Sequence, residues 1–230
     1  MIALVRLRLT GFVQTGRALA PVLAGLLALG ILYGGGGGAR PADVYGVSAV
    51  VIFPVLAWQT KILLDVEPDV QRRLARVVVG PAREQAAGLL AAFVAGLAVV
   101  LVALVMPWPL GAVSLASGPE GRPALVGVAL GLWAHLLALS AAVAVGALAS
   151  RAVTRSAGYG AAVLAVGVVG VVVFGLSDSV APWLVPPVMA TARAVTRPVD
   201  PGTGLLFTGW AVLWVALALA GYARGRRNRA

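Results

Sequence analysis

The chain has 230 residues, of which 60% are hydrophobic and 11% are charged, and its mean hydropathy is +0.97. Soluble domains carry about 25% charged residues, so this composition is that of an integral membrane protein. The net charge of +10 does not indicate nucleic-acid binding, because the arginines lie between apolar segments. Absence of cysteine excludes disulfides and thiolate metal sites, and a single histidine excludes a histidine cluster, so we expect no bound metal.

Six stretches approach the about 20 apolar residues that cross a bilayer core. They are residues 18–33, 44–64, 86–108, 124–149, 158–176 and 205–223. The first is the shortest, and it gains length if its helix begins near Phe12 while Arg17 extends its guanidinium to the headgroups. We therefore predict an all-α integral membrane protein with six transmembrane helices in one domain, residues 1–230.

The arginines predict the orientation, since basic residues accumulate in cytoplasmic loops. With both termini in the cytoplasm, only four of the 18 basic residues face outward. Those four are Arg40, Arg122, Arg193 and Arg197. We expect a multi-pass protein of a bacterial-type inner (plasma) membrane. A cleaved signal peptide is the alternative for the N-terminus, and it would leave five spans.

Residues 1–17 mix apolar side chains with Arg6, Arg8 and Arg17. This pattern predicts an interfacial helix that lies on the cytoplasmic leaflet and bends into the first span. A basic flank that only orients that span is the alternative.

Near the other end of the chain, residues 177–204 combine five prolines with apolar side chains, together with Asp178 and Trp183. Short helices that dip into the outer interface, anchored by Trp183, explain both features.

A charged island, residues 65–85, separates the second and third spans. Its charged residues are Asp65, Glu67, Asp69, Arg72, Arg73, Arg76, Arg83 and Glu84. Pro68 suits the first position of a helix, Asp69 suits its positive end and pairs with Arg73, and Gly80 with Pro81 ends the helix. A second helix then begins near Ala82 and continues into the third span.

The island helix carries an apolar stripe of Val70, Leu74, Val77 and Val78, at helical spacing. Arg72, Arg73 and Arg76 lie off this stripe. An exposed apolar stripe marks an interaction site or the membrane surface, so we predict a docking element. A loop that merely fixes topology is the alternative, although it requires neither the acidic residues nor the stripe.

Polar residues within the spans are few. His135 lies midway along the fourth span, where an ionisable residue is a candidate for the transport pathway, although a neutral histidine bonded to a neighbouring helix is the simpler interpretation. Lys61 is expected to extend to the headgroups. Gly127 and Gly131 allow close helix approach, either inside the bundle or in a dimer. Residues 34–38 are all glycine but lack a following Gly-Lys-Ser/Thr, so we predict that the chain is not itself an ATPase or other enzyme.

With these features the chain resembles the permease subunit of an ATP-binding-cassette (ABC) transporter, of the type-2 exporter family of small six-span permeases. RLRLTGFVQTGRALAPVL resembles the family's interfacial connecting helix, and DVEPDVQRRLARVVVGPAREQAAGLL resembles its coupling helix, with GPAREQ at a small-Pro-small-Arg turn. Residues 177–204 are similar to its short outer helices. The RGRRNR tail ends inside, as the family requires.

The resemblance implies a dimer of permeases, identical or homologous, bound to separate cytoplasmic ATPase subunits that hold the ATP and magnesium; this chain would bind no cofactor. The cargo would be hydrophobic or amphipathic, such as a drug, a peptide or a lipid-like product, as in multidrug efflux. The residues implied in ATPase coupling are Asp65, Glu67, Asp69, Val70, Arg72, Arg73, Leu74, Arg76, Val77 and Arg83. A scaffold or a secondary transporter outside the ABC class is the alternative; a secondary transporter would require carboxylates near the midplane.

Overall fold

The computed structural model describes residues 1–114 and 123–227; Arg122 and Arg229, two of the arginines used to predict orientation, lie outside these ranges. The described residues are helical and contain no strand, only one isolated bridge between Ala39 and Val113. Their helices are α1 (Ile2–Gln14), α2 (Leu19–Tyr33), α3 (Pro41–Leu64), α4 (Asp69–Val79), α5 (Pro81–Val105), α6 (Ala124–Leu148), α7 (Arg151–Thr154), α8 (Ala157–Phe174), η1 (Pro182–Leu184), α9 (Val188–Val195) and α10 (Pro201–Arg227).

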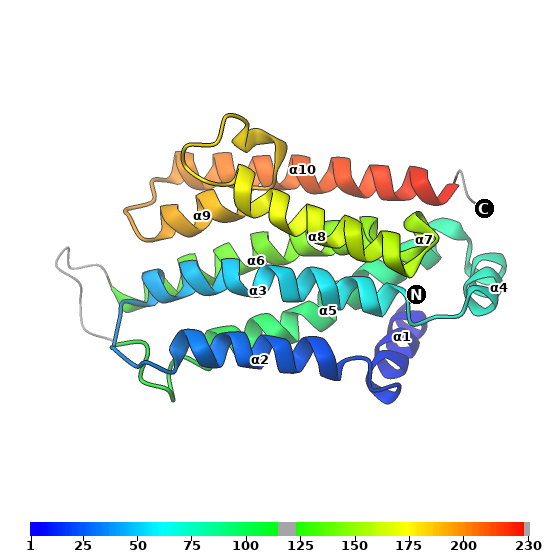
Figure 1. Ribbon diagram of the computed structural model, residues 1–230, viewed down its shortest axis with the longest axis horizontal. Helices are drawn as coiled ribbons and strands as arrows, with labels where there is room; N and C mark the ends of the chain where they lie inside the picture. The colour runs from blue at the N-terminus through cyan, green and yellow to red at the C-terminus, as the bar shows by residue number, and fades with distance from the viewer. Residues whose placement is uncertain (115–122, 228–230) are drawn as a thin grey trace.

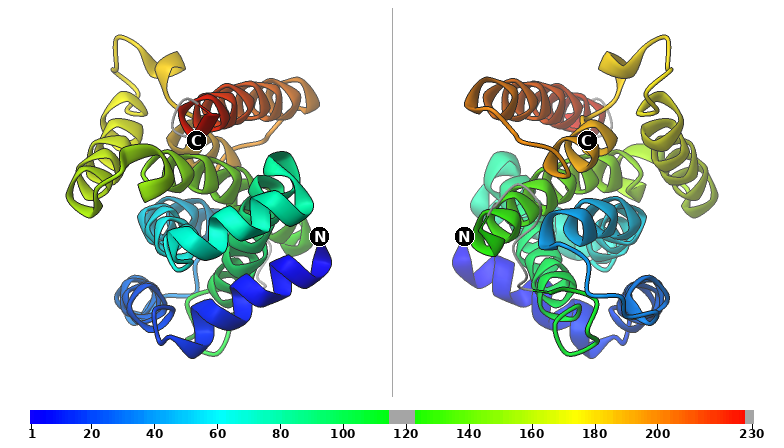
Figure 2. Two further views of the ribbon diagram at one scale, coloured as in Figure 1. Left: turned by 90° about the vertical axis from the view of Figure 1, so that its right-hand side faces the viewer. Right: turned by 90° about the vertical axis from the view of Figure 1, so that its left-hand side faces the viewer.

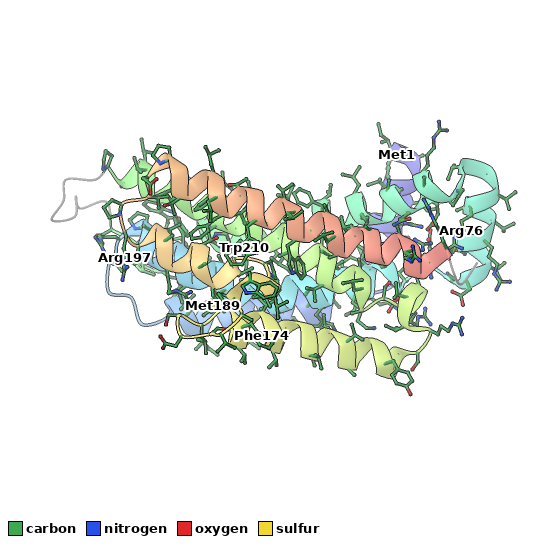
Figure 3. All side chains as sticks on the ribbon, turned by 90° about the horizontal axis from the view of Figure 1, so that it is seen from above. Met1, Arg76, Phe174, Met189, Arg197 and Trp210 are labelled. Carbon is green, nitrogen blue, oxygen red and sulfur yellow. The ribbon has the colours of Figure 1, made fainter. Side chains whose placement is uncertain are left out.

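The long helices run side by side along the longest axis, whereas α1 and α4 lie across one end of the bundle (Figures 1 and 2). That end also carries α7 and the last turns of α10. We call it the arginine-rich end, after Arg6, Arg8, Arg72, Arg73, Arg76, Arg151, Arg155, Arg224, Arg226 and Arg227. Arg76 and Arg197 lie near opposite ends of the bundle, and the helices between them carry mostly apolar side chains (Figure 3).

Helices α3 and α6 form the centre of the bundle, because small residues let their backbones approach closely. A Cβ atom at Gly131 would overlap the ring of Tyr45, and one at Gly146 would overlap the carbonyl of Ala57 and the side chain of Thr60. Ala138 and Ala142 on the same face of α6 are fully buried. The glycines therefore serve packing inside the bundle, as small residues do between membrane helices.

Among the described residues, five helices are long and apolar enough to cross a membrane singly, and α1 with α2 makes a sixth candidate bent by 75°. The chain thus has the architecture of a multi-pass membrane protein, as predicted. The predicted start of the first span at residue 18 agrees with α2, which begins at Leu19. The helix does not extend back to Phe12, because α1 ends at Gln14 and Gly16 adopts φ +69°. Tertiary contact of the preceding Arg17, described below, holds this break. A position of α1 in the membrane interface stays a prediction.

The predicted outer segment does contain two short helices, η1 and α9. Helix α9 packs on α3 so closely that a Cβ atom at Gly46 would meet the carbonyl of Ala192 at 2.7 Å. Val188 and Val195 of α9 are buried there. Trp183 is largely exposed and Asp178 is exposed, so neither contributes to the core. Their placement in a membrane interface stays a prediction.

Candidate functional site

Helix α4 forms because its sequence supplies both a start and a stop. Pro68 precedes the first helical residue, so α4 begins one residue later than predicted, at Asp69. Gly80 ends it with φ +84° and ψ 155°, a conformation open essentially only to glycine. Pro81 then opens α5 directly. Asp69 pairs with Arg72, at 3.6 Å, and not with Arg73 as predicted.

The apolar stripe of α4 faces away from the bundle. Val70, Leu74, Val77 and Val78 are between 62% and 85% exposed, whereas Arg72, on the opposite side of the helix, is buried. Helix α4 lies across the end of the bundle (Figure 2), and its stripe is exposed there. Four large apolar side chains so placed form a contiguous surface of the kind that marks an interaction site.

Beneath α4 lies a buried ionic cluster, which we define as Arg8, Glu67, Arg76, Glu84 and Arg226. Arg8 Nη2 donates to Glu84 Oε1 at 2.5 Å and to Glu67 Oε2 at 2.6 Å. Arg226 Nη2 donates to Glu84 Oε2 at 2.6 Å, and Arg76 Nε approaches the same oxygen at 3.5 Å. The cluster therefore joins α1, α4, α5, α10 and the residues before α4.

Glu84 is the centre of this cluster and is 1% exposed. A carboxylate is rarely buried so completely unless it is paired, and here both its oxygens accept from arginines. A glycine one turn along α5 makes room, because a Cβ atom at Gly88 would overlap the guanidinium of Arg8. Sequence reasoning counted Glu84 among the charges of the island but gave it no role.

Arg8 keeps its proton firmly in this setting. Burial disfavours the charged guanidinium, but the hydrogen bonds that it donates to Glu67 and Glu84 and the negative charges of these carboxylates outweigh that cost, so the pKa of Arg8 lies above its ordinary value. Arg8 thus stays charged, and its bonds hold α1 against Glu84 of α5 and Glu67 before α4.

A second group of contacts surrounds Asp65 at the end of α3. Lys61 Nζ donates to its Oδ2 at 3.0 Å, and the backbone N–H of Arg151 donates to its Oδ1 at 2.8 Å. The guanidiniums of Arg151 and Arg17 donate to the carbonyl of Asp65, at 2.8 and 3.3 Å. Lys61 and Arg17 were expected to reach for headgroups. Instead Lys61 pairs with Asp65 at the end of its own helix, and Arg17 ties the break before α2 to the end of α3. Arg151 ties α7 to the same end.

The predicted coupling residues therefore divide into two groups. Arg72 donates to the carbonyls of Leu64 and Glu67, and Arg76 approaches Glu84, so these two side chains stabilise the chain itself. Arg73 and Arg83 are exposed and make no hydrogen bond or ion pair with the described residues. A role of any of these side chains in binding an ATPase stays a prediction.

His135 lies far from this end, in the middle of α6, and is fully buried. Its Nδ1 donates to the carbonyl of Gly131 at 2.7 Å, and Nε2 lies 3.1 Å from Ser48 Oγ of α3. His135 is thus bonded to a neighbouring helix, as the simpler interpretation expects, and a role in a transport pathway stays a prediction. Within residues 1–114 and 123–227, no three His, Cys, Asp or Glu side chains come together as a metal site would require.

A groove of about 420 Å³ runs between α1, α2, α3 and α5. Phe12, Leu26 and Val99 are among its lining residues, and Gln59 is the only one that is polar. The side-chain oxygen of Gln59 is buried without a hydrogen-bond partner.

Comparisons of the chain with protein families, with curated proteins and with solved structures found no match.

Proposed function

We propose that the chain is the membrane-spanning subunit of an ATP-driven ABC exporter, which forms the translocation path with a second permease and is energised by separate ATPase subunits. The apolar stripe of α4 carries this proposal. It is presented away from the bundle at the end richest in arginine, which the positive-inside rule places in the cytoplasm. A soluble protein can reach a surface that points away from the bilayer, and lipid cannot.

The ionic cluster supports a mechanical role for that surface. A partner that moves α4 also moves Arg76, and through Glu84 it acts on α1, α5 and α10. Because these contacts are buried and charge-assisted, they resist stretching more than exposed ion pairs do. Closure of ATPase subunits bound at α4 would thereby shift three other helices.

The cargo is proposed to be hydrophobic or amphipathic. The groove of about 420 Å³ has an almost wholly apolar lining, which suits such a molecule better than an ion or a sugar. A secondary transporter would hold carboxylates near the midplane. In the described parts of the chain, the acids belong to the ends of helices and to loops, which favours the ATP-driven class.

Co-purification with an ATPase tests this function. The wild-type protein, extracted from its own membrane in mild detergent, is expected to retain a phosphate-loop ATPase in stoichiometric amount, seen as ATP hydrolysis in the eluate. Leu74→Asp places a charge in the stripe and is expected to abolish this retention. The same change at the exposed Val180, between α8 and η1, is the matched control and is expected to retain the ATPase.

Both variants must reach the membrane in wild-type amounts, which immunoblotting of membrane fractions measures. A wild-type preparation with no ATPase, or a Leu74→Asp variant that still exports and hydrolyses ATP like the wild type, would contradict the function. The double variant Arg73→Glu with Leu74→Asp is expected to insert into the membrane but to lose the coupling of ATP hydrolysis to transport. A double variant that exports and hydrolyses ATP like the wild type would also contradict the function.

A further inference from the structure

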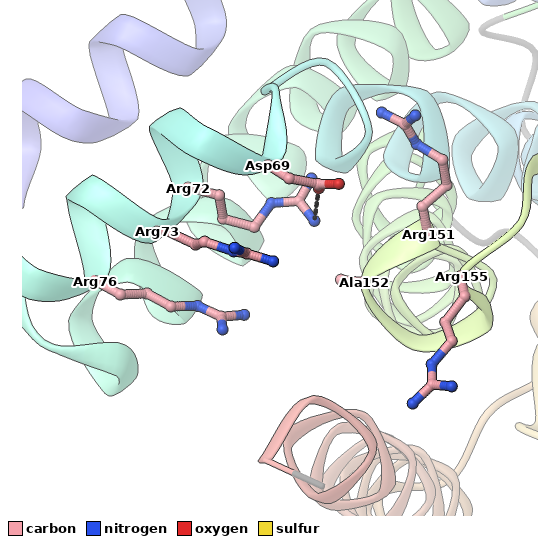
Figure 4. A pocket seen from close by; sticks show the side chains of 7 residues that line it. All are labelled: Asp69, Arg72, Arg73, Arg76, Arg151, Ala152 and Arg155. Carbon is pink, nitrogen blue, oxygen red and sulfur yellow. Dashed lines mark ion pairs between the residues drawn. The ribbon is translucent and has the colours of Figure 1, made fainter. Parts of the chain in front are cut away.

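A second feature of the arginine-rich end is a cavity of about 280 Å³ between α4 and α7. It is lined by Asp69, Arg72, Arg73, Arg76, Arg151, Ala152 and Arg155 (Figure 4). Five arginines against one aspartate give the lining a net charge of +4 (5 − 1). Guanidiniums gathered around one space repel each other, so the arrangement is stabilised by an anion that they share.

The acids of this region do not supply that anion. The carboxylate of Asp69 is mostly exposed and pairs with Arg72 at 3.6 Å. Asp65 binds Lys61 and Arg151, and Glu84 is taken mainly by Arg8 and Arg226.

Two arginines of the cavity remain uncompensated. The guanidiniums of Arg73 and Arg155 form no hydrogen bond or ion pair with any described residue. They come from different elements: Arg73 points from α4 toward α7, and Arg155 extends from the end of α7 beside the same space (Figure 4). Both side chains line one cavity, but in Figure 4 they do not point toward each other.

Arg155 occupies an unusual backbone position. It ends α7 in the left-handed conformation, with φ 65° and ψ −17°, and it is the only non-glycine residue with positive φ in the described ranges. Glycine is the usual residue at such a helix end, because a side chain costs energy there. An arginine kept in this position is explained if its side chain has a task in the cavity.

The cavity lies at the level where two spans end. Helix α7 follows α6 after two residues, and α8 begins at Ala157, directly after the turn that carries Arg155. Both α6 and α8 are candidate spans. Tyr159, in the first turn of α8, is 73% exposed, and exposed tyrosines are enriched at the depth of the lipid headgroups. The cavity is therefore expected at the depth of the headgroup layer.

We propose that the cavity binds the phosphate of an anionic phospholipid headgroup, with Arg73 and Arg155 as its principal donors. Planar guanidiniums bind phosphate oxygens in pairs of parallel hydrogen bonds, and basic pockets between membrane helices on the cytoplasmic side bind anionic headgroups. Arg72 and Arg76 line the cavity from the side of α4 away from the apolar stripe, whereas Arg73 flanks the stripe, three residues after Val70 and four before Val77. The lipid site does not depend on ATP-driven export.

Lipid titration of the purified full-length protein tests this site. Thermal unfolding in detergent is measured with added phosphatidylglycerol, phosphatidylcholine or inorganic phosphate, and retained lipids are identified by native mass spectrometry. The wild type is expected to bind phosphatidylglycerol in preference to the other two. Arg73→Gln with Arg155→Gln is expected to weaken that binding about thirtyfold, about fivefold for each arginine.

The matched control is Arg6→Gln with Arg224→Gln, which removes the same charge from two exposed arginines of this end that do not line the cavity. An equal loss in this control, or equal wild-type binding of the two lipids, overturns the site. If the wild type binds inorganic phosphate saturably but does not bind phosphatidylglycerol, the ligand is free phosphate and not a lipid headgroup, and the lipid proposal is overturned. If the protein instead retains an acidic polypeptide through these arginines, and that polypeptide displaces phosphatidylglycerol, the cavity binds a protein partner and the lipid proposal is overturned. If the double variant fails to fold, the comparison of phosphatidylglycerol, phosphatidylcholine and inorganic phosphate binding by the wild type decides the test.

Discussion

At the scale of single residues, Glu84 decides how the arginine-rich end is held together. Its carboxylate is shared by arginines of α1, α4 and α10, while Glu67 takes the remaining contact of Arg8. Removing one member of a buried ion group leaves charges that water cannot solvate, and that costs more than the group contributes when it is intact. The consequences of a change at Glu84 should therefore exceed those of any exposed charge nearby.

Glu84→Gln tests this. It preserves size and removes the charge, so Arg8 and Arg226 face a neutral amide, and we expect a loss of about 3 kcal/mol in the free energy of unfolding. The measurement is reversible unfolding in detergent by heat or denaturant. The neighbouring exposed Arg83→Gln is the control and should change stability by no more than about 0.5 kcal/mol. Equal stabilities of the two variants would show that the cluster contributes nothing to the fold.

Sequence alone could not find this cluster. Glu84 was visible as one of several charges in the island, but its partners Arg8 and Arg226 lie 76 and 142 positions away. No local pattern encodes such distances. For the same reason Arg72 was expected to face a partner, although its guanidinium turns inward to backbone carbonyls. Which side of α4 contacts the bundle depends on how α4 lies across it, and only the assembled fold decides that.

At the scale of elements, helices whose length and ends are determined by local sequence signals were predicted well. The extents of α3, α5, α6, α8 and α10 follow from apolar length, and α4 follows from Pro68 and Gly80. The start of α2 at Leu19 is within one residue of the predicted 18, but the bond of Arg17 to Asp65 and the conformation of Gly16, which separate α2 from α1, were not predicted. Tertiary contact overrides local preference at that point.

Packing of α3 against α6 makes a prediction at this scale. Gly131→Ala puts a methyl group into the space filled by Tyr45, and overpacking of this kind costs about 1–3 kcal/mol. Gly170→Ala, on α8, meets nothing within 4 Å and should be neutral or stabilising by up to about 1 kcal/mol, because alanine favours helix. Unfolding in detergent compares the two. A Gly131→Ala variant as stable as Gly170→Ala would show that α3 and α6 are packed less closely than described.

At the scale of the whole molecule, the number of crossings depends on α2. With 15 residues, α2 is about 22 Å long, shorter than the about 30 Å of a bilayer core. Tilt only increases such a mismatch, so α2 crosses only if the bilayer thins around it or flanking residues reach outward. If α2 crosses, six spans put both termini on one side; if it does not, the arginines of α1 and of α10 are on opposite sides.

Single cysteines decide between these arrangements, since the chain has none of its own. Gly35→Cys follows α2 in open space, and Ile2→Cys is exposed at the start of α1. In intact cells a membrane-impermeant maleimide should label Gly35→Cys and leave Ile2→Cys unlabelled until the membrane is permeabilised. Val180→Cys should behave like the first and Val77→Cys, in the α4 stripe, like the second. Labelling of Gly35→Cys and Ile2→Cys from the same side would mean that α2 does not cross, because α1, the other helix between the two positions, lies across the end of the bundle.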